Sequence, residues 1–144
     1  MNKPANPVET NDNLQEQAMQ RSNTDNAPRS AIHQTLYSAD TFVQHDYLAG
    51  KALPDIARPQ EGQINWLHFV GINDAALLKH ALEPYGIHEL VIEDILSRKQ
   101  RPKIEDYGNY VFTAAQVYHY TTTGKLHSDQ VYVIIGKDFV LSFQ

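Results

Sequence analysis

The last third of the sequence consists of strand-like segments separated by short turns, and this pattern limits the possible folds more than any other feature. The run from Tyr110 to Tyr120 is rich in aromatic and β-branched residues, which favour strands. Because the segments between such runs are short and contain glycine, we expect an antiparallel meander. Its other parts are a loop at Thr121 to Lys125, a strand at Asp129 to Ile135, a tight turn at Gly136 to Asp138 and a last strand at Phe139 to Phe143.

Further strand-like segments lie upstream of this meander. Ile64 to Val70 is mostly apolar and is bounded by Gly62 and Gly71, a pattern typical of a buried strand. Thr35 to Tyr37 and Thr41 to Tyr47 are shorter and flank a turn made of serine, alanine and aspartate. These segments add three predicted strands to the sheet.

Two helices are predicted between Val70 and the meander. The first follows Asn73 or Asp74, either of which can cap it, and Gly86 is a natural end point. Its apolar positions recur at helical spacing at Leu77, Leu78, Ala81, Leu82 and Tyr85. The second helix runs from His88 to Lys99, with an acidic first turn and a basic last turn that suit the helix dipole. Strands on both sides of two helices predict an α/β or α+β class with a mixed sheet.

Residues 1 to 30 differ in composition from the rest of the chain. They are rich in asparagine, glutamine and proline and contain almost no branched or aromatic side chains. Such a segment cannot bury enough apolar surface to offset the entropy lost on ordering its backbone. We therefore expect a disordered polar tail at 1–30, followed by one domain at 31–144.

The overall composition excludes several classes of function. The formal net charge is −5, which argues against a nucleic-acid partner held by bulk electrostatics. There is no cysteine, so disulfides and thiolate metal sites are excluded. No apolar run approaches the roughly 20 residues that span a bilayer. Phosphate loops, zinc-protease helices and hydrolase elbows have no counterpart in the sequence, so we expect neither an enzyme nor a membrane-spanning segment within this chain.

The second helix carries the most informative side chains. At helical spacing, its core-facing positions are Val91, Ile92, Ile95 and Leu96. Glu93 and Asp94 are expected on either side of the outward direction, with Leu90 between them. Two carboxylates beside an exposed leucine are what a subunit interface with a weak Mg²⁺ site would present, because Mg²⁺ is typically held by one or two carboxylates plus water. The alternative is an ordinary charged face in which Asp94 pairs with Arg98 one turn later.

Two other groups of residues have simple structural explanations. The seven histidines are scattered, and His68 is predicted to lie in a strand at the edge of the core rather than to bind a metal. A basic cluster follows the second helix. It could bind an anion, although compensation of the helix C-terminus explains it more simply. Its members are Arg98, Lys99, Arg101 and Lys103.

Five segments together resemble one family. They are Asn65–Gly71 (NWLHFVG), Tyr85–Leu96 (YGIHELVIEDIL), Gln100–Glu105 (QRPKIE), Asn109–Phe112 (NYVF) and Val140–Gln144 (VLSFQ). In this order and spacing they resemble the N-terminal cytosolic domain of CorA-type magnesium and cobalt transporters. The resemblance covers about residues 32–144.

The resemblance implies an α/β/α domain with a mixed, largely antiparallel sheet, which forms one fifth of a homopentameric cytosolic funnel. It also implies that Mg²⁺ bound between subunits keeps the channel closed, with Mg²⁺ and possibly Co²⁺ as the transported ions. On this basis Asp94 matches the interfacial sensing carboxylate, Glu93 matches the carboxylate beside it, and Leu90 lies at the interface.

The resemblance further implies parts that this sequence does not contain. These are a long helix leading to the membrane, two transmembrane segments and a Gly-Met-Asn signature at the pore. The chain stops one residue after Phe143, at an apolar strand, so we expect it to be C-terminally incomplete. The parent protein is expected in the inner membrane with this segment in the cytoplasm, and the isolated fragment is expected to be mainly monomeric.

Three alternatives remain open. A stand-alone interaction module could retain this fold, and a zinc-transporting relative would share the architecture, although the segment Gln100–Glu105 favours the magnesium and cobalt type. A metal-dependent hydrolase using Glu93 and Asp94 is the third, but no nucleophile or base accompanies them. A downstream coding sequence for two apolar segments of about 20 residues would decide in favour of the transporter.

Overall fold

Seven strands of the chain form a single sheet in the computed structural model, which describes residues 30–48, 53–71 and 73–144. The sheet order is β2-β1-β3-β7-β6-β5-β4. The strands are β1 (Ala31–Tyr37), β2 (Phe42–Leu48), β3 (Ile64–Val70), β4 (Lys103–Asp106), β5 (Tyr110–Tyr120), β6 (Leu126–Gly136) and β7 (Phe139–Phe143). The predicted polar tail lies outside the described residues, except for Ser30.

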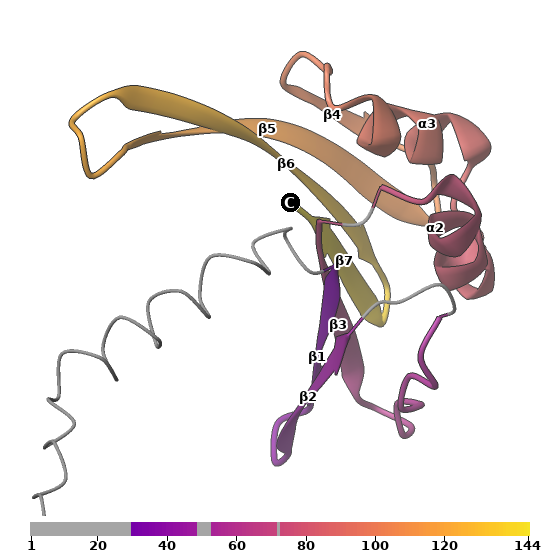
Figure 1. The fold of residues 1–144 in the computed structure, drawn as a ribbon. Coiled ribbons are helices and arrows are strands. Elements are labelled where there is room, and N and C mark those ends of the chain that lie inside the picture. The colour runs from indigo at the N-terminus through magenta and orange to yellow at the C-terminus, as the bar shows by residue number, and fades with distance from the viewer. Residues whose placement is uncertain (1–29, 49–52, 72) are drawn as a thin grey trace, which may run out of the picture.

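All neighbouring strands pair antiparallel except β3 and β7, which are parallel. The chain leaves β3, forms the helices and then the β4–β5–β6–β7 meander, whose last strand, β7, lies beside β3. This confirms the predicted mixed, largely antiparallel sheet. β5 and β6 pair from Tyr110–Gly136 to Tyr120–Leu126, well past the ends of β4 and β7, so their far ends project beyond the sheet as a two-stranded ribbon (Figure 1).

The helical segment between β3 and β4 has clear start and stop signals. α2 (Ala75–Leu82) begins at Asp74, whose side chain accepts hydrogen bonds from the backbone amides of Ala76 and Leu77. A short 3₁₀ helix, η1 (Glu83–Tyr85), carries Pro84 in its first turn, and Gly86 ends it in the left-handed conformation, with φ 61°. α3 (Glu89–Ser97) then begins at His88, whose ring nitrogen accepts from the backbone amide of Leu90.

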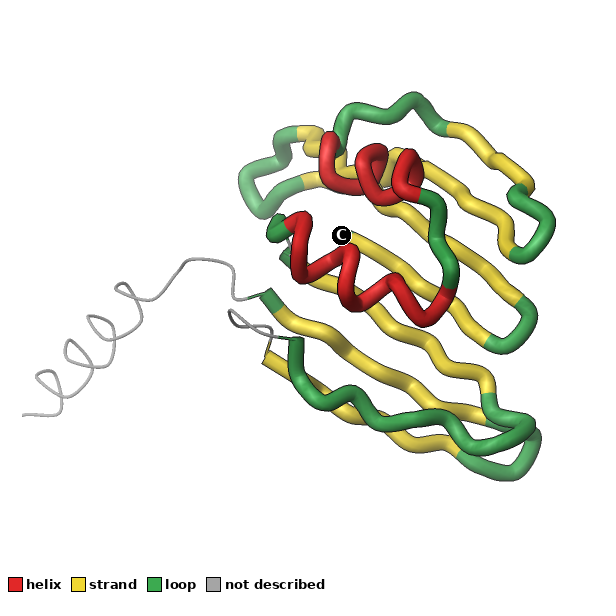
Figure 2. Tube along the Cα trace, turned by 90° about the vertical axis from the view of Figure 1, so that its right-hand side faces the viewer, coloured by secondary structure: helices red, strands yellow, loops and turns green. Residues whose placement is uncertain are grey.

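Both α helices lie on the same face of the sheet (Figures 1 and 2). The core forms between them and alternate residues of the central strands, because successive strand residues point to opposite faces. Its largest fully buried members are Phe69, Phe112, Ile32, Leu67, Leu78, Leu82, Ile134, Leu141 and Val91. The class is α/β as predicted. The described residues supply one helical layer, so the second layer of the implied α/β/α arrangement is not among them.

The structure differs from the sequence predictions at several boundaries. β3, β5 and β7 have the predicted bounds, whereas β1 and β6 each begin earlier than predicted. β4 was not predicted, and the second helix was predicted to extend to Lys99 but ends at Ser97. Arg98 adopts φ 50° and terminates it, so no basic residue lies in its last turn. The predicted basic last turn was therefore wrong, whereas the predicted acidic first turn is confirmed at Glu89. In the part of the chain that the structure describes, no helix is both long and apolar enough to cross a bilayer.

Candidate functional site

The orientation of α3 decides which of its side chains are accessible. Val91, Ile92 and Ile95 are buried against the sheet, as the helical spacing predicted. Leu90 is 58% exposed, and Glu93 is also exposed on the outer side. These two side chains therefore lie where the sequence placed them.

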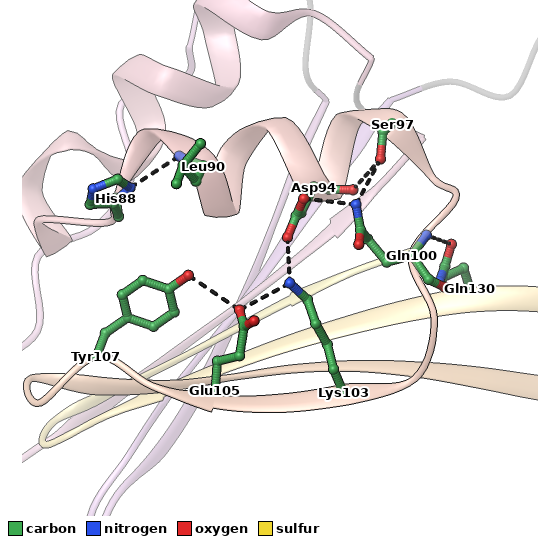
Figure 3. Close-up of polar contacts among 9 residues, drawn as sticks. All are labelled: His88, Leu90, Asp94, Ser97, Gln100, Lys103, Glu105, Tyr107 and Gln130. Atoms are coloured by element: carbon green, nitrogen blue, oxygen red, sulfur yellow. Dashed lines mark hydrogen bonds and ion pairs between the residues drawn. The ribbon is translucent and has the colours of Figure 1, made fainter.

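Asp94 does not point outward. Its side chain is only 23% exposed and is directed toward the sheet edge formed by β4 (Figure 3). Two groups bind its two oxygens: Gln100 Nε2 donates to Oδ1 at 2.7 Å, and Lys103 Nζ donates to Oδ2 at 2.7 Å. The alternative pairing of Asp94 with Arg98 is not what the structure shows, since Arg98 has left the helical conformation.

The error in placing Asp94 has a physical cause. The helical wheel was centred on four core positions that included Leu96, but Leu96 is only partly buried. The buried stripe consists of Val91, Ile92 and Ile95 without Leu96, which shifts its centre and moves Asp94 from the outer side toward the flank of the helix. The flank of α3 faces β4, a strand that the sequence analysis did not predict.

Lys103 connects Asp94 to a second carboxylate. Its Nζ also donates to Glu105 Oε2 at 3.0 Å, and the Tyr107 hydroxyl donates to the same Oε2 at 3.2 Å (Figure 3). Lys103 and Glu105 are two residues apart in β4, so both side chains lie on the strand face that α3 covers. The side chains of Lys103 and Glu105 are 28% and 41% exposed. We call Asp94, Lys103 and Glu105 the α3–β4 ion triad.

The charge of Lys103 is well supported by its surroundings. The hydrogen bond to Asp94 raises the pKa of Lys103, partial burial opposes this rise, and Glu105 adds to it. The ammonium also lies 5.4 Å from the centre of the Phe112 ring, a distance at which a cation is attracted to the face of an aromatic ring. Lys103 is therefore a counter-ion of two carboxylates rather than a member of the basic cluster predicted from the sequence.

The loop after α3 is fixed by a second set of hydrogen bonds. Gln130 on β6 accepts from the backbone amide of Gln100 at 3.2 Å and donates to the carbonyl of the same residue. Ser97 donates to the carbonyl of Asp94 at 2.9 Å. These bonds place the Gln100 side chain beside Asp94, so the orientation of the carboxylate depends on the sheet as well as on the helix.

Glu93 and Asp94 fit a Mg²⁺ site only in part. Carboxylate oxygens are the donors that Mg²⁺ prefers, and Glu93 makes no ion pair with any described residue. However, the described ranges contain no group of three histidine, aspartate or glutamate side chains arranged to hold a metal ion. Of the two neighbouring carboxylates on α3, Glu93 and Asp94, the second is engaged within the subunit. A complete site therefore needs oxygen ligands from outside this part of the chain.

The family model for the CorA-like Mg²⁺ transporter protein matches residues 61–144 of this chain, which include β3, both α helices and the whole meander. The chain belongs to this family. The resemblance inferred from the five sequence segments is thereby confirmed. The family is one of transporters rather than enzymes, which agrees with the lack of catalytic motifs.

A curated relative and two solved structures extend this result. The chain is 41% identical over 80 residues to the cobalt/magnesium transport protein CorA of Thermotoga maritima, a region that is 55% of this chain and 23% of that protein. The chain therefore spans about a quarter of this CorA relative.

The fold is similar to that of the complete CorA magnesium transporter of Methanocaldococcus jannaschii, with a TM-score of 0.56 at 12% identity over 78% of this chain and 31% of that one. It is equally similar to full-length CmaX, with a TM-score of 0.56 at 14% identity over 83% of this chain and 36% of that one. At such identities these two likenesses concern the fold alone.

Proposed function

We propose that this chain is the cytosolic regulatory part of a Mg²⁺ and Co²⁺ transporter of the inner membrane, assembled as a homopentamer. In this proposal, Glu93 and Asp94 contribute oxygen ligands to Mg²⁺ between neighbouring subunits, and the bound ion stabilises the closed channel. The observation that carries the proposal is the family match over residues 61–144, because this range contains α3 with both carboxylates.

The geometry of α3 supports the proposed roles. Glu93 and Leu90 are exposed on the outer side of a helix whose opposite side is anchored in the core, so a neighbouring subunit could reach them without unfolding the domain. An apolar contact at Leu90 would exclude water beside the carboxylates, which strengthens their attraction for a cation. Two carboxylates in water gain little over the hydration of Mg²⁺, so binding depends on ligands from the second subunit.

The test uses the longer protein that carries this chain, reconstituted in lipid vesicles. Uptake of Mg²⁺ is measured while the Mg²⁺ concentration on the side of this domain is varied. In Asp94→Ala and Glu93→Ala, half-inhibition should need several-fold more Mg²⁺, with a larger shift in the double variant. Glu61→Ala removes an equal charge from an exposed turn before β3 and should leave inhibition unchanged.

Unchanged inhibition in both single variants and in the double variant would remove these residues from a sensing site. An absence of any Mg²⁺ or Co²⁺ uptake by the wild-type protein would overturn the transport function itself.

A further inference from the structure

Both oxygens of Asp94 are already bound by groups of the same subunit. Gln100 Nε2 and Lys103 Nζ each approach one oxygen at 2.7 Å, and the carboxylate is mostly shielded from solvent. A cation that takes Asp94 as a ligand competes with these partners, because each carboxylate oxygen already accepts a hydrogen bond from one of them. Of the two partners, the charged lysine makes the stronger electrostatic interaction.

Lys103 occupies a position suited to a cation. Its ammonium lies between one carboxylate on α3 and another on β4, at 2.7 Å from Asp94 and 3.0 Å from Glu105. A cation held between two carboxylates from different elements is also the arrangement in which a divalent ion would be bound. If Lys103 lost its charge, the two carboxylates would lack their counter-ion and would attract a cation from solution.

From this geometry we propose that Lys103 is a built-in competitor for the cation at Asp94, so that the α3–β4 ion triad sets how much Mg²⁺ the domain needs before it responds. This inference rests on the proposed function in taking Mg²⁺ as the ion that Asp94 senses. The positioning residue is Lys103, which acts through Asp94 and Glu105 and contacts the ion at no stage.

The position and length of Lys103 make exchange feasible. The side chain is 28% exposed and belongs to a short strand at the edge of the sheet, with β5 on one side only. Partly exposed ion pairs contribute little net free energy, because both charges keep some of their hydration. The ammonium can therefore turn toward solvent on its flexible four-carbon stem, and Asp94 then loses its charged partner.

The experiment measures cation binding at Asp94 in the 144-residue chain. Mn²⁺ is used as a paramagnetic probe for a hard divalent cation, and broadening of the backbone amide signals of α3 is followed by NMR, with Mg²⁺ added as a competitor. Lys103→Met should lower the Mn²⁺ concentration for half-broadening near Asp94 at least three-fold. Lys99→Met changes the net charge equally at an exposed position outside the triad and should shift this concentration less than 1.5-fold.

Two further variants keep the proposal falsifiable. Lys103→Arg retains the positive charge and should bind Mn²⁺ as the wild type does, and Lys103→Gln replaces Lys103→Met if that variant does not give a native spectrum. Adding Asp94→Asn to Lys103→Met should abolish the gain. An equal gain in Lys99→Met, or no gain in either neutral Lys103 variant, would overturn the proposal.

The failure of this inference can be told apart from the failure of the proposed function. If the neutral Lys103 variants bind Mn²⁺ no better, the competitor role is wrong, while the transport test with Asp94→Ala and Glu93→Ala stands on its own. If those transport variants are inhibited normally but Lys103→Met gains Mn²⁺ affinity, the competition exists and the sensing role of Asp94 is wrong.

Discussion

Arg98 takes the left-handed conformation where α3 ends, with φ 50°, and among the described residues it is the one non-glycine with a positive φ. This conformation brings Cβ close to the following carbonyl oxygen and costs roughly 1–2 kcal/mol for an L-residue. Glycine avoids the cost but loses more entropy on folding, by roughly 0.4–1 kcal/mol. We therefore predict that Arg98→Gly raises the free energy of unfolding by about 0.5–1 kcal/mol, measured by urea denaturation.

Arg98→Ala is the matched control for this prediction. It removes the same side chain and leaves the backbone strain in place, so it should give no gain. If both variants change stability equally, the effect belongs to the arginine side chain and the strain argument is wrong.

His68 should make the stability of the domain depend on pH. Its ring lies on the sheet face opposite the helices, where Nδ1 is 2.8 Å from the Ser142 hydroxyl and the ring stacks on His33. Partial burial lowers the pKa of His68 below its ordinary value of 6.5, the neighbouring His33 lowers it further, and the contact with Ser142 opposes the shift.

The sign of this effect follows from proton binding in the two states. Because the pKa of His68 is lower in the folded state, the unfolded chain takes up the proton first as the pH falls. The contribution of neutral His68 to the unfolding free energy is therefore fully present well above pH 6.5. It is lost as the pH falls through this value toward the folded pKa. We predict that His68→Gln gives a shallower decrease in unfolding free energy between pH 7.5 and 5.5. A decrease as steep as that of the wild type would contradict it.

At the scale of single elements, α2 depends on its first capping residue. The sequence offered Asn73 or Asp74, and the structure selects Asp74, whose Oδ1 accepts from the amides of Ala76 and Leu77 at 2.9 and 3.0 Å. Asp74→Ala should therefore lower the unfolding free energy by about 1 kcal/mol. Asp74→Ser keeps a hydrogen-bond acceptor at the cap and should retain most of this unfolding free energy. A large decrease of the unfolding free energy in Asn73→Ala would mean that the cap was assigned to the wrong residue.

The strands predicted correctly are those with local stop signals. β3 lies between two glycines, and the β5 boundary coincides with the polar loop from Thr121 to Lys125. Such boundaries are set by residues adjacent in sequence, so a single sequence is sufficient to find them. β1 was predicted too short, because its first residues gain their extended conformation from pairing with β2 and β3 rather than from their own propensity.

The features that the sequence did not predict depend on distant contacts. β4 has only four residues and follows Pro102, so it is too short to give a clear strand signal. In the structure its exposure alternates, with Lys103 and Glu105 half-buried and Ile104 and Asp106 exposed. The direction of Asp94 depends on which strand edge lies beneath α3, and that edge is β4 itself. Because β4 was not predicted, the pairing of Lys103 with Asp94 was not predicted either.

At the scale of the whole molecule, the domain presents two different surfaces to its surroundings. One carries the outer side of α3, where Leu90 and Glu93 are exposed. The other is the sheet face opposite the helices, where Trp66 is 44% and Ile135 is 51% exposed. The candidate sensing residues all lie on the helical side. Association through α3 should respond to Mg²⁺, whereas association through the sheet face should not.

The last prediction concerns assembly of the 144-residue chain. The outer side of α3 offers one large exposed apolar side chain, Leu90, whereas a stable interface buries on the order of 1,000 Å² or more. The net charge of −5 also makes copies of the chain repel each other. We therefore expect a monomer in sedimentation at micromolar concentration. Millimolar Mg²⁺ should not change the result, since the described residues of one subunit contain no group of three side chains arranged to hold a metal ion. A stable pentamer would contradict this prediction. A dimer that ignores Mg²⁺ and is lost in Trp66→Ser would instead show that the sheet face, and not α3, brings the copies together.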